Sequence, residues 1–127
     1  MWVYSSGWGE LFRIFNVVPI KLNLVSKGYS GNGAGMNNPK MENVPNVGPI
    51  PTGFYTIGMP FDSPEHGPEC LPLTPDVKNT MYGRSGFLIH GDSTTNPGCS
   101  SRGCIILPKI VRDLIAQTLD KDLQVIH

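Results

Sequence analysis

The chain has 127 residues, with ten basic and ten acidic side chains and a formal net charge of zero at pH 7. This length fits a single domain, residues 1–127, that can bury a hydrophobic core. Because lysine and arginine form no cluster, the sequence excludes the electrostatic footprint of a nucleic-acid-binding protein. The apolar runs are much shorter than the roughly 20 residues of a membrane-spanning helix, so we expect a soluble chain without membrane insertion.

Turn-forming residues are frequent, with 15 glycines and 12 prolines, which indicates short strands rather than long helices. Residues 2–5 and 11–15 flank the turn sequence SGWG and predict a β-hairpin. Residues 17–25 predict a further strand, which Pro19 places at an edge or a bulge.

The middle of the chain alternates irregular and strand-like segments. Residues 27–52 are rich in glycine, asparagine and proline without a sustained period, which predicts a long functional loop. Residues 54–57 and 70–73 predict strands. Residues 61–68 predict a loop, in which His66 is expected to be an ordinary solvated histidine.

One convincing helix is predicted after Pro108, which suits a first helical turn. Residues 123–126 then predict a closing strand. The expected fold is mostly β, a β-sandwich or partly closed barrel with one α-helix in the C-terminal half packed on the sheet. The apolar stripe expected to face the sheet comprises Ile110, Val111, Leu114, Ile115, Thr118 and Leu119.

The chemistry is expected in the segment FLIHGDSTTNPGCSSRGCIIL, residues 87–107. Its apolar ends predict two strands, which would bring His90 and Cys104 to neighbouring strand ends. A thiol is a nucleophile as its thiolate, and an adjacent imidazole can take its proton. Gly103 allows close approach of a substrate carbonyl, and backbone N–H groups beside Cys104 can stabilise an oxyanion.

The cysteines also have simpler interpretations. Cys104 among isoleucines is compatible with a small buried apolar side chain. Three cysteines make an odd set, so at least one thiol is unpaired unless the chain dimerises through it. Cys70 could pair with Cys99 in an oxidising compartment, or Cys99 could form a labile disulfide with Cys104.

A structural zinc site is a further alternative, because His90, Asp92, Cys99 and Cys104 are all of ligand type. Their spacing matches neither paired cysteines nor paired histidines, so we predict no metal. No cofactor is predicted either. The glycines of GYSGNGAG lack the lysine and the strand-to-helix context of a phosphate-binding loop.

The sequence IHGD, followed after a short loop by SRGCI, resembles the histidine and Ser-x-Gly-Cys signature of L,D-transpeptidase catalytic domains. The whole chain more closely resembles the compact L,D-transpeptidase-related effector domains of bacterial type VI secretion systems. Five blocks that cover nearly its full length carry this resemblance, namely WVY, GYSGNGAGMNNP, GPIPTGFYTIG, GRSGFLIHGD and SSRGCIILP.

The resemblance implies a thioacyl mechanism on peptidoglycan stem peptides. Cys104, activated by His90, would remove the terminal D-alanine of a tetrapeptide stem and transfer the acyl group to water or to another D-amino acid. It also implies a toxin made in the bacterial cytoplasm, exported by secretion components and matched by an immunity protein. The target-cell periplasm would be its site of action. The N-terminus MWVYSSGWGE lacks the features of a signal peptide, so export by another route is expected.

The chain departs from ordinary L,D-transpeptidases at two positions. Arg102 stands where these have a second histidine, and Ile106 stands where they have a polar residue. The group that orients His90 must therefore come from elsewhere, and Asp92 is the nearest candidate, although it could instead form an Asx turn. Ser101 could hydrogen-bond near the nucleophile or cap a turn. Arg102 could bind a stem carboxylate or face solvent.

Two other functions remain open from the sequence. The same fold could be a non-catalytic module that binds the cell wall, or the thiol could serve a cysteine peptidase that acts on protein.

Overall fold

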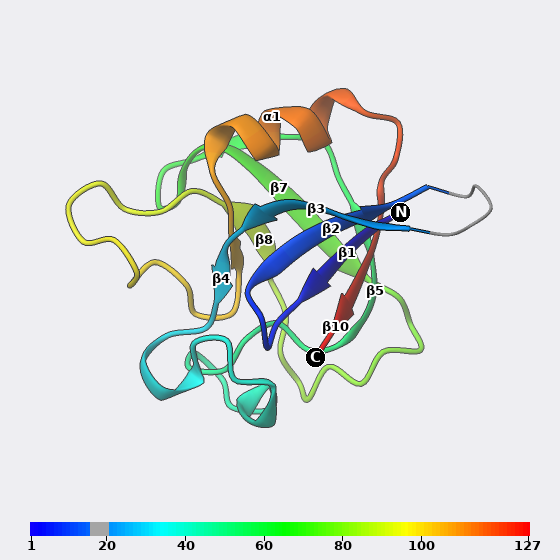
Figure 1. Ribbon diagram of the computed structural model, residues 1–127. Coiled ribbons are helices and arrows are strands. Elements are labelled where there is room, and N and C mark those ends of the chain that lie inside the picture. Colours follow the sequence, from blue (N-terminus) through cyan, green and yellow to red (C-terminus); the bar gives the residue numbers. More distant parts are fainter. Residues whose placement is uncertain (16–20) are drawn as a thin grey trace.

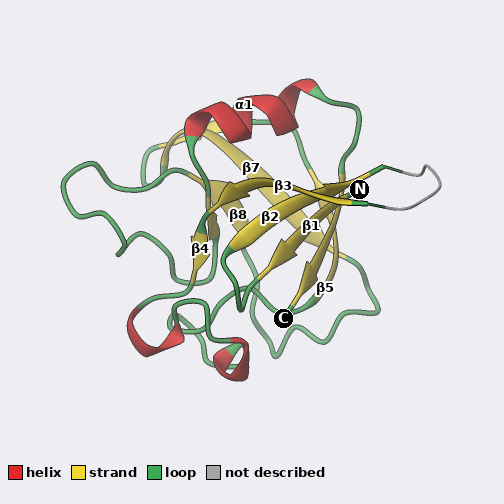
Figure 2. Cartoon of the chain, in the orientation of Figure 1, coloured by secondary structure: helices red, strands yellow, loops and turns green. Residues whose placement is uncertain are grey.

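The computed structural model describes residues 1–15 and 21–127 and has a mostly β fold (Figures 1 and 2). The described strands are β1 (Trp2–Ser5), β2 (Glu10–Ile14), β3 (Leu22–Lys27), β4 (Tyr29–Ser30), β5 (Gly53–Ile57), β6 (Phe61–Ser63), β7 (Gly67–Pro75), β8 (Leu88–His90), β9 (Ile105–Ile106) and β10 (Asp122–Ile126). The helices are α1 (Lys109–Gln117) and two short 3₁₀ turns, η1 (Gly33–Gly35) and η2 (Pro39–Met41).

The strands form one open sheet in the order β3-β2-β1-β10-β5-β7-β8-β9-β4, and β6 pairs with β7 outside this path. The pairs β1/β10 and β8/β9 are parallel and the other pairs are antiparallel. The predicted fold class, mostly β with one helix on the sheet, is confirmed.

The N-terminal hairpin is confirmed, with Trp2 opposite Arg13 and Ser5 opposite Glu10 in the β1/β2 register. The strand expected at residues 17–25 is only partly tested, because residues 16–20, including Pro19, lie outside the described residues. Its described part is β3, which extends to Lys27 at one end of the sheet.

The loop expected at residues 61–68 is wrong. This segment contains β6 and the first two residues of β7, joined by a tight turn, with Phe61 opposite Cys70 and Ser63 opposite Gly67. The local sequence could not reveal β6, because this short strand is defined by its backbone hydrogen bonds to β7 and not by its own residue types. β7 is correspondingly longer than the strand expected at residues 70–73.

The helix is confirmed in position, but its apolar face is narrower than predicted. α1 begins just after Pro108 and contacts β7, with Val111 and Ile115 buried. Ile110 is exposed by 78% and Leu119, which lies beyond the helix, by 99%. The stripe was overestimated because Arg112 occupies part of the buried face and donates hydrogen bonds to three backbone carbonyls, those of Leu107, Pro68 and Glu69.

The core lies between the sheet and α1. It gathers apolar side chains from strands at both ends of the chain, including Trp2 and Tyr4 of β1 and Leu123 and Val125 of β10. Ile89 of β8 and Ile105 of β9 are also fully buried. This packing makes a rigid mount of the two short strands that carry the predicted catalytic residues. No helix among the described residues is long and apolar enough to cross a membrane.

Candidate active site

The two predicted catalytic residues flank the parallel pair β8/β9. Ile89 is opposite Ile105, so Cys104, which directly precedes β9, lies beside Leu88 at the start of β8. The Leu88 N–H donates to Cys104 Sγ at 3.4 Å. The expectation of neighbouring strand ends is therefore wrong in detail, because it did not consider a parallel pairing. The strands are so short that His90 and Cys104 still line one cleft.

His90, the last residue of β8, is almost completely buried. Its Nδ1 lies 2.8 Å from the carbonyl oxygen of Gly91. A carbonyl can only accept a hydrogen bond, so Nδ1 must carry the proton and Nε2 must keep its lone pair. Among the described residues, Nε2 is buried without a hydrogen-bond partner. Unpaired buried nitrogen atoms are rare in proteins, and at this position the lone pair is available to accept a proton.

Burial shifts both groups toward their neutral forms. It raises the pKa of the Cys104 thiol, against the opposing effects of the Leu88 N–H and the charge of Arg84. It lowers the pKa of His90, against the opposing hydrogen bond to Gly91. The cleft therefore holds a neutral thiol and a neutral imidazole, and an imidazole in this form can act as a general base.

The cleft has a volume of about 720 Å³. Besides His90 and Cys104 it is lined by polar and charged side chains, including Asn46, Glu65, His66, Asp92, Cys99 and Arg102. The long segment predicted to be a functional loop, residues 27–52, contributes Asn46 to this lining.

Asp92 is hydrogen-bonded to its own loop and to Tyr29 of β4. Its carboxylate accepts hydrogen bonds from the Tyr29 hydroxyl (2.6 Å), the Ser100 hydroxyl (2.9 Å) and the Gly98 N–H (3.0 Å). Burial raises the pKa of the carboxyl, but these bonds outweigh it and the pKa lies below its usual range. The atom that contacts His90 Nδ1 is instead the Gly91 carbonyl oxygen, which residue types alone could not reveal.

Ser101 organises the turn before Cys104. Its hydroxyl donates to the Cys104 carbonyl and accepts from the N–H groups of Gly31 (2.8 Å) and Gly103 (3.1 Å). The Gly103 N–H is therefore already used by Ser101. Gly103 has a φ of 131°, a conformation that side chains other than glycine rarely adopt. Both residues shape the turn that presents Cys104.

Two arginines differ sharply in their surroundings. Arg102, predicted to bind substrate or face solvent, is exposed and lines the cleft. Arg84 was not predicted at all, yet it is buried over the Phe87 ring and its guanidinium holds several loops together. It donates to the carbonyls of Glu42 (2.6 Å), Pro49 (2.7 Å), Gly48 (3.0 Å) and Arg102 (3.1 Å).

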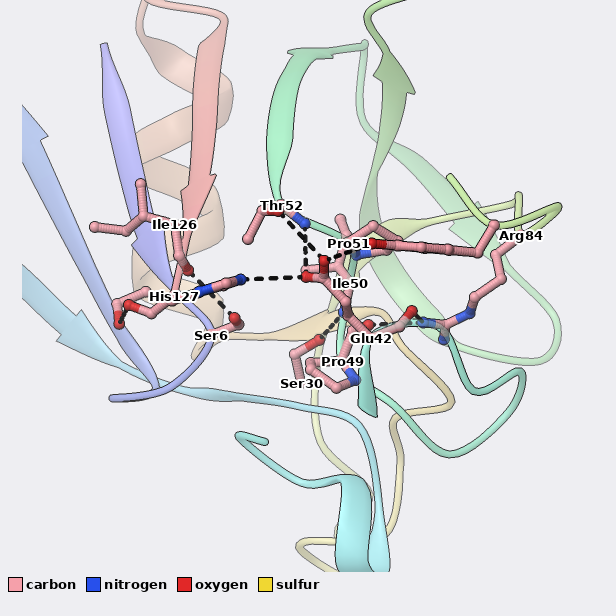
Figure 3. Close-up of polar contacts among 12 residues, drawn as sticks. Ser6, Ser30, Glu42, Pro49, Ile50, Pro51, Thr52, Arg84, Ile126 and His127 are labelled. Atoms are coloured by element: carbon pink, nitrogen blue, oxygen red, sulfur yellow. Dashed lines mark hydrogen bonds and ion pairs between the residues drawn. The ribbon is translucent and has the colours of Figure 1, made fainter. Parts of the chain in front are cut away.

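The surroundings of Arg84 extend to the C-terminal end of the chain (Figure 3). The Glu42 carboxylate accepts from the Thr52 N–H and lies 3.8 Å from the His127 ring. The Ser30 hydroxyl accepts from the Ile50 N–H. These contacts join distant parts of residues 27–52 to one another and, through Glu42 and His127, to the C-terminal end of the chain.

His66 is the second residue that sequence reasoning misjudged. It lies in the turn between β6 and β7, and its ring packs against that of His90 with centroids 4.4 Å apart. Its neighbours in the sequence, Glu65 and Gly67, are typical of a solvated turn, so no local signal could have indicated this contact.

All three cysteines are free, with Cys70 buried, Cys99 exposed and Cys104 half-buried. The zinc alternative finds no ligand set in the part of the chain that the structure describes, because no three side chains of ligand type come together there.

Solved structures with the same fold come from two bacteria. Bd1075 of Bdellovibrio bacteriovorus is 15% identical with a TM-score of 0.65, and the helical cell shape determining protein Pgp2 from Campylobacter jejuni is 21% identical with a TM-score of 0.63. Each similarity covers 98% of this chain but 46% of the other protein. The chain thus spans less than half the length of these structures. None of the curated proteins matches the chain in sequence.

The family comparison is more specific than the fold. The Tlde1 domain matches residues 25–125, which include the second half of β3, all of β4 to β9, α1 and nearly all of β10, as well as every residue of the cleft. The chain therefore belongs to the Tlde1 domain family, a family of type VI secretion effector domains related to L,D-transpeptidases.

Proposed function

We propose that this domain is a cysteine-dependent enzyme that acts on the stem peptides of peptidoglycan as an L,D-carboxypeptidase, an L,D-transpeptidase or both. The observation that carries the proposal is the His90 imidazole, whose tautomer is set by Gly91 and whose unpaired Nε2 lies in the same cleft as the Cys104 thiol. Membership of an effector family related to L,D-transpeptidases supports the substrate class.

The proposed acylation follows from the neutral pair. His90 Nε2 takes the proton of the Cys104 thiol as Sγ attacks the carbonyl carbon that precedes the terminal D-alanine. The imidazolium then gives that proton to the leaving nitrogen, which releases D-alanine and leaves a thioester on Sγ. Since the Gly103 N–H is held by Ser101, the backbone N–H of Cys104 is the donor that we assign to the oxyanion.

Deacylation uses the same groups in reverse. His90 removes a proton from water or from the amine of a D-amino acid, which attacks the thioester, and the thiol is reprotonated as it leaves. Water yields a tripeptide stem and an amine yields an exchanged tetrapeptide. In both cases the donor that a cell needs for cross-linking is consumed.

The setting of this activity is part of the proposal. The family consists of secretion effectors, which supports delivery by secretion components into the periplasm of a target cell and a cognate immunity protein in the producing cell. Exposed Arg102 in the cleft is the residue that we assign to a stem carboxylate, through its planar fork of donors.

The test is the muropeptide profile after incubation with tetrapeptide stems. We expect the wild type to produce tripeptides or exchanged tetrapeptides, and Cys104→Ala and His90→Ala each to lower the rate by at least about a thousandfold. Cys70→Ser is the matched control, because its thiol is buried outside the cleft lining. Full activity of Cys104→Ala would refute the proposal, and cleavage of proteins in place of stems would identify a cysteine peptidase.

A further inference from the structure

The contact between His66 and His90 joins two separate elements of the fold. The His66 ring comes from the turn between β6 and β7, and the two ring planes are inclined by 31° at a centroid distance of 4.4 Å. The turn itself is held by Ser63, whose hydroxyl accepts from the N–H groups of Glu65 (3.2 Å) and His66 (3.1 Å). His66 thus presents its ring from a fixed position.

His90 needs such a contact to act as a base. Its hydrogen bond to Gly91 fixes the orientation of the imidazole within the ring plane, but one bond to a carbonyl allows the plane to tilt. Nε2 has no partner among the described residues that would prevent this tilt. A ring packed on the face restrains the remaining motion, and a displacement of about 1 Å at a catalytic group can cost a hundredfold in rate.

We propose that His66 is a positioning residue of this site, whose ring covers one face of the His90 imidazole and holds Nε2 in place for proton transfer. The inference rests on the proposed function of His90 and Cys104, and adds to it a residue outside the Ser-x-Gly-Cys signature. His66 also lines the cleft, and its side chain is 34% exposed.

The contact with His66 also affects the pKa of His90. The side chains whose charge affects the pKa of His90 are Arg112 of α1, Asp92 after β8 and His66. The Glu65 carboxylate lies 3.9 Å from Nε2 of His66. The electrostatic effect of the His66 ring lowers the pKa of His90, in the same direction as burial. The base therefore stays neutral to lower pH than burial alone allows.

The experiment compares His66→Phe and His66→Ala with Lys78→Ala, a substitution at an exposed turn residue that does not line the cleft. We expect His66→Ala to lower kcat by about tenfold with little change in KM, because Nε2 is no longer held. His66→Phe keeps a packed ring but removes the electrostatic effect of the imidazole on His90, so kcat should stay within about threefold while the acidic limb of the pH profile moves to higher pH. Lys78→Ala should match the wild type.

A second readout does not depend on the substrate. The chain has three histidines, so their ring protons can be followed by NMR as the pH is varied. The midpoint of His90 should rise from wild type to His66→Phe, and further in His66→Ala, where burial is also reduced. The inference would be overturned if both variants kept the wild-type kcat, the wild-type pH profile and the wild-type titration midpoint of His90. Activity that survives Cys104→Ala would instead overturn the proposed function, while the NMR titration would still decide whether His66 acts on His90.

Discussion

Replacement of Arg84 by lysine tests how the cleft is held in shape. The two terminal nitrogens of the guanidinium each serve two carbonyls, Nη1 those of Glu42 and Pro49 and Nη2 those of Gly48 and Arg102. An ammonium group donates from a single point and can reach one of these pairs, so two carbonyls lose their donor.

The magnitude follows from the environment of those carbonyls. Leaving a buried acceptor without a partner costs about 1–3 kcal/mol. The bonds to Pro49 and Gly48 are fully buried, whereas those to Glu42 and Arg102 are partly buried and can be replaced by water. Whichever pair loses its donor contains one fully buried carbonyl, so we expect Arg84→Lys to lower the free energy of unfolding by about 1–3 kcal/mol, which corresponds to roughly 4–12 °C in Tm for a chain of this size.

The assay is urea unfolding followed by circular dichroism, with kcat measured on the folded variant. Lys78→Ala is the matched control, because this cation lies in an exposed turn. Since the Arg102 carbonyl directly precedes Gly103, we also expect a lower kcat in Arg84→Lys even under conditions where it is folded. A loss of less than about 1 kcal/mol would refute the reasoning, because two orphaned carbonyls cannot cost so little unless both are solvated.

Two further predictions concern the turn and the base. A Cβ at residue 103 would lie 2.6 Å from Arg84 Nη2 and 2.7 Å from Phe87 Cε1, so Gly103→Ala should lower stability by about 1–3 kcal/mol and kcat by about a hundredfold. Gly98→Ala, also at positive φ but with open space around it, should lose stability alone, and equal kcat losses in the two variants would contradict this explanation. His90 titrates below its usual pKa of 6.5 in the folded state, so the unfolded chain binds its proton first and the unfolding free energy should fall as the pH drops below 6.5. The slope from this group is at most about 1.4 kcal/mol per pH unit, and His90→Gln should remove it, as urea unfolding between pH 4 and 8 would measure. An unchanged slope would show that His90 is not the group responsible.

The two strand segments that carry the proposed pair, His90 and Cys104, could be predicted from local sequence alone. An apolar run that delivers His90 and another that starts after Gly103 define two buried strands whatever their neighbours are, because burial of such runs is dictated by the hydrophobic effect. The mostly β class, the N-terminal hairpin and the start of α1 were likewise predictable, because strand alternation, turn residues and a proline at the helix start act over a few residues.

The residues that contact His90 and hold the turn before Cys104 could be identified only from the tertiary structure. His90 Nδ1 is hydrogen-bonded to the backbone carbonyl of Gly91. Because every residue has a backbone carbonyl, residue types could not indicate this partner and pointed to Asp92 instead. Arg84 and His66 act across the fold, on loops and a ring that are distant in the sequence, and nothing adjacent to either residue records the contact. The sequence by itself was enough to propose Cys104 and His90 as the reacting groups, because a thiol and an imidazole are recognised from residue type alone. Their protonation states and orientation depend on burial and partners, which exist only once the sheet has assembled.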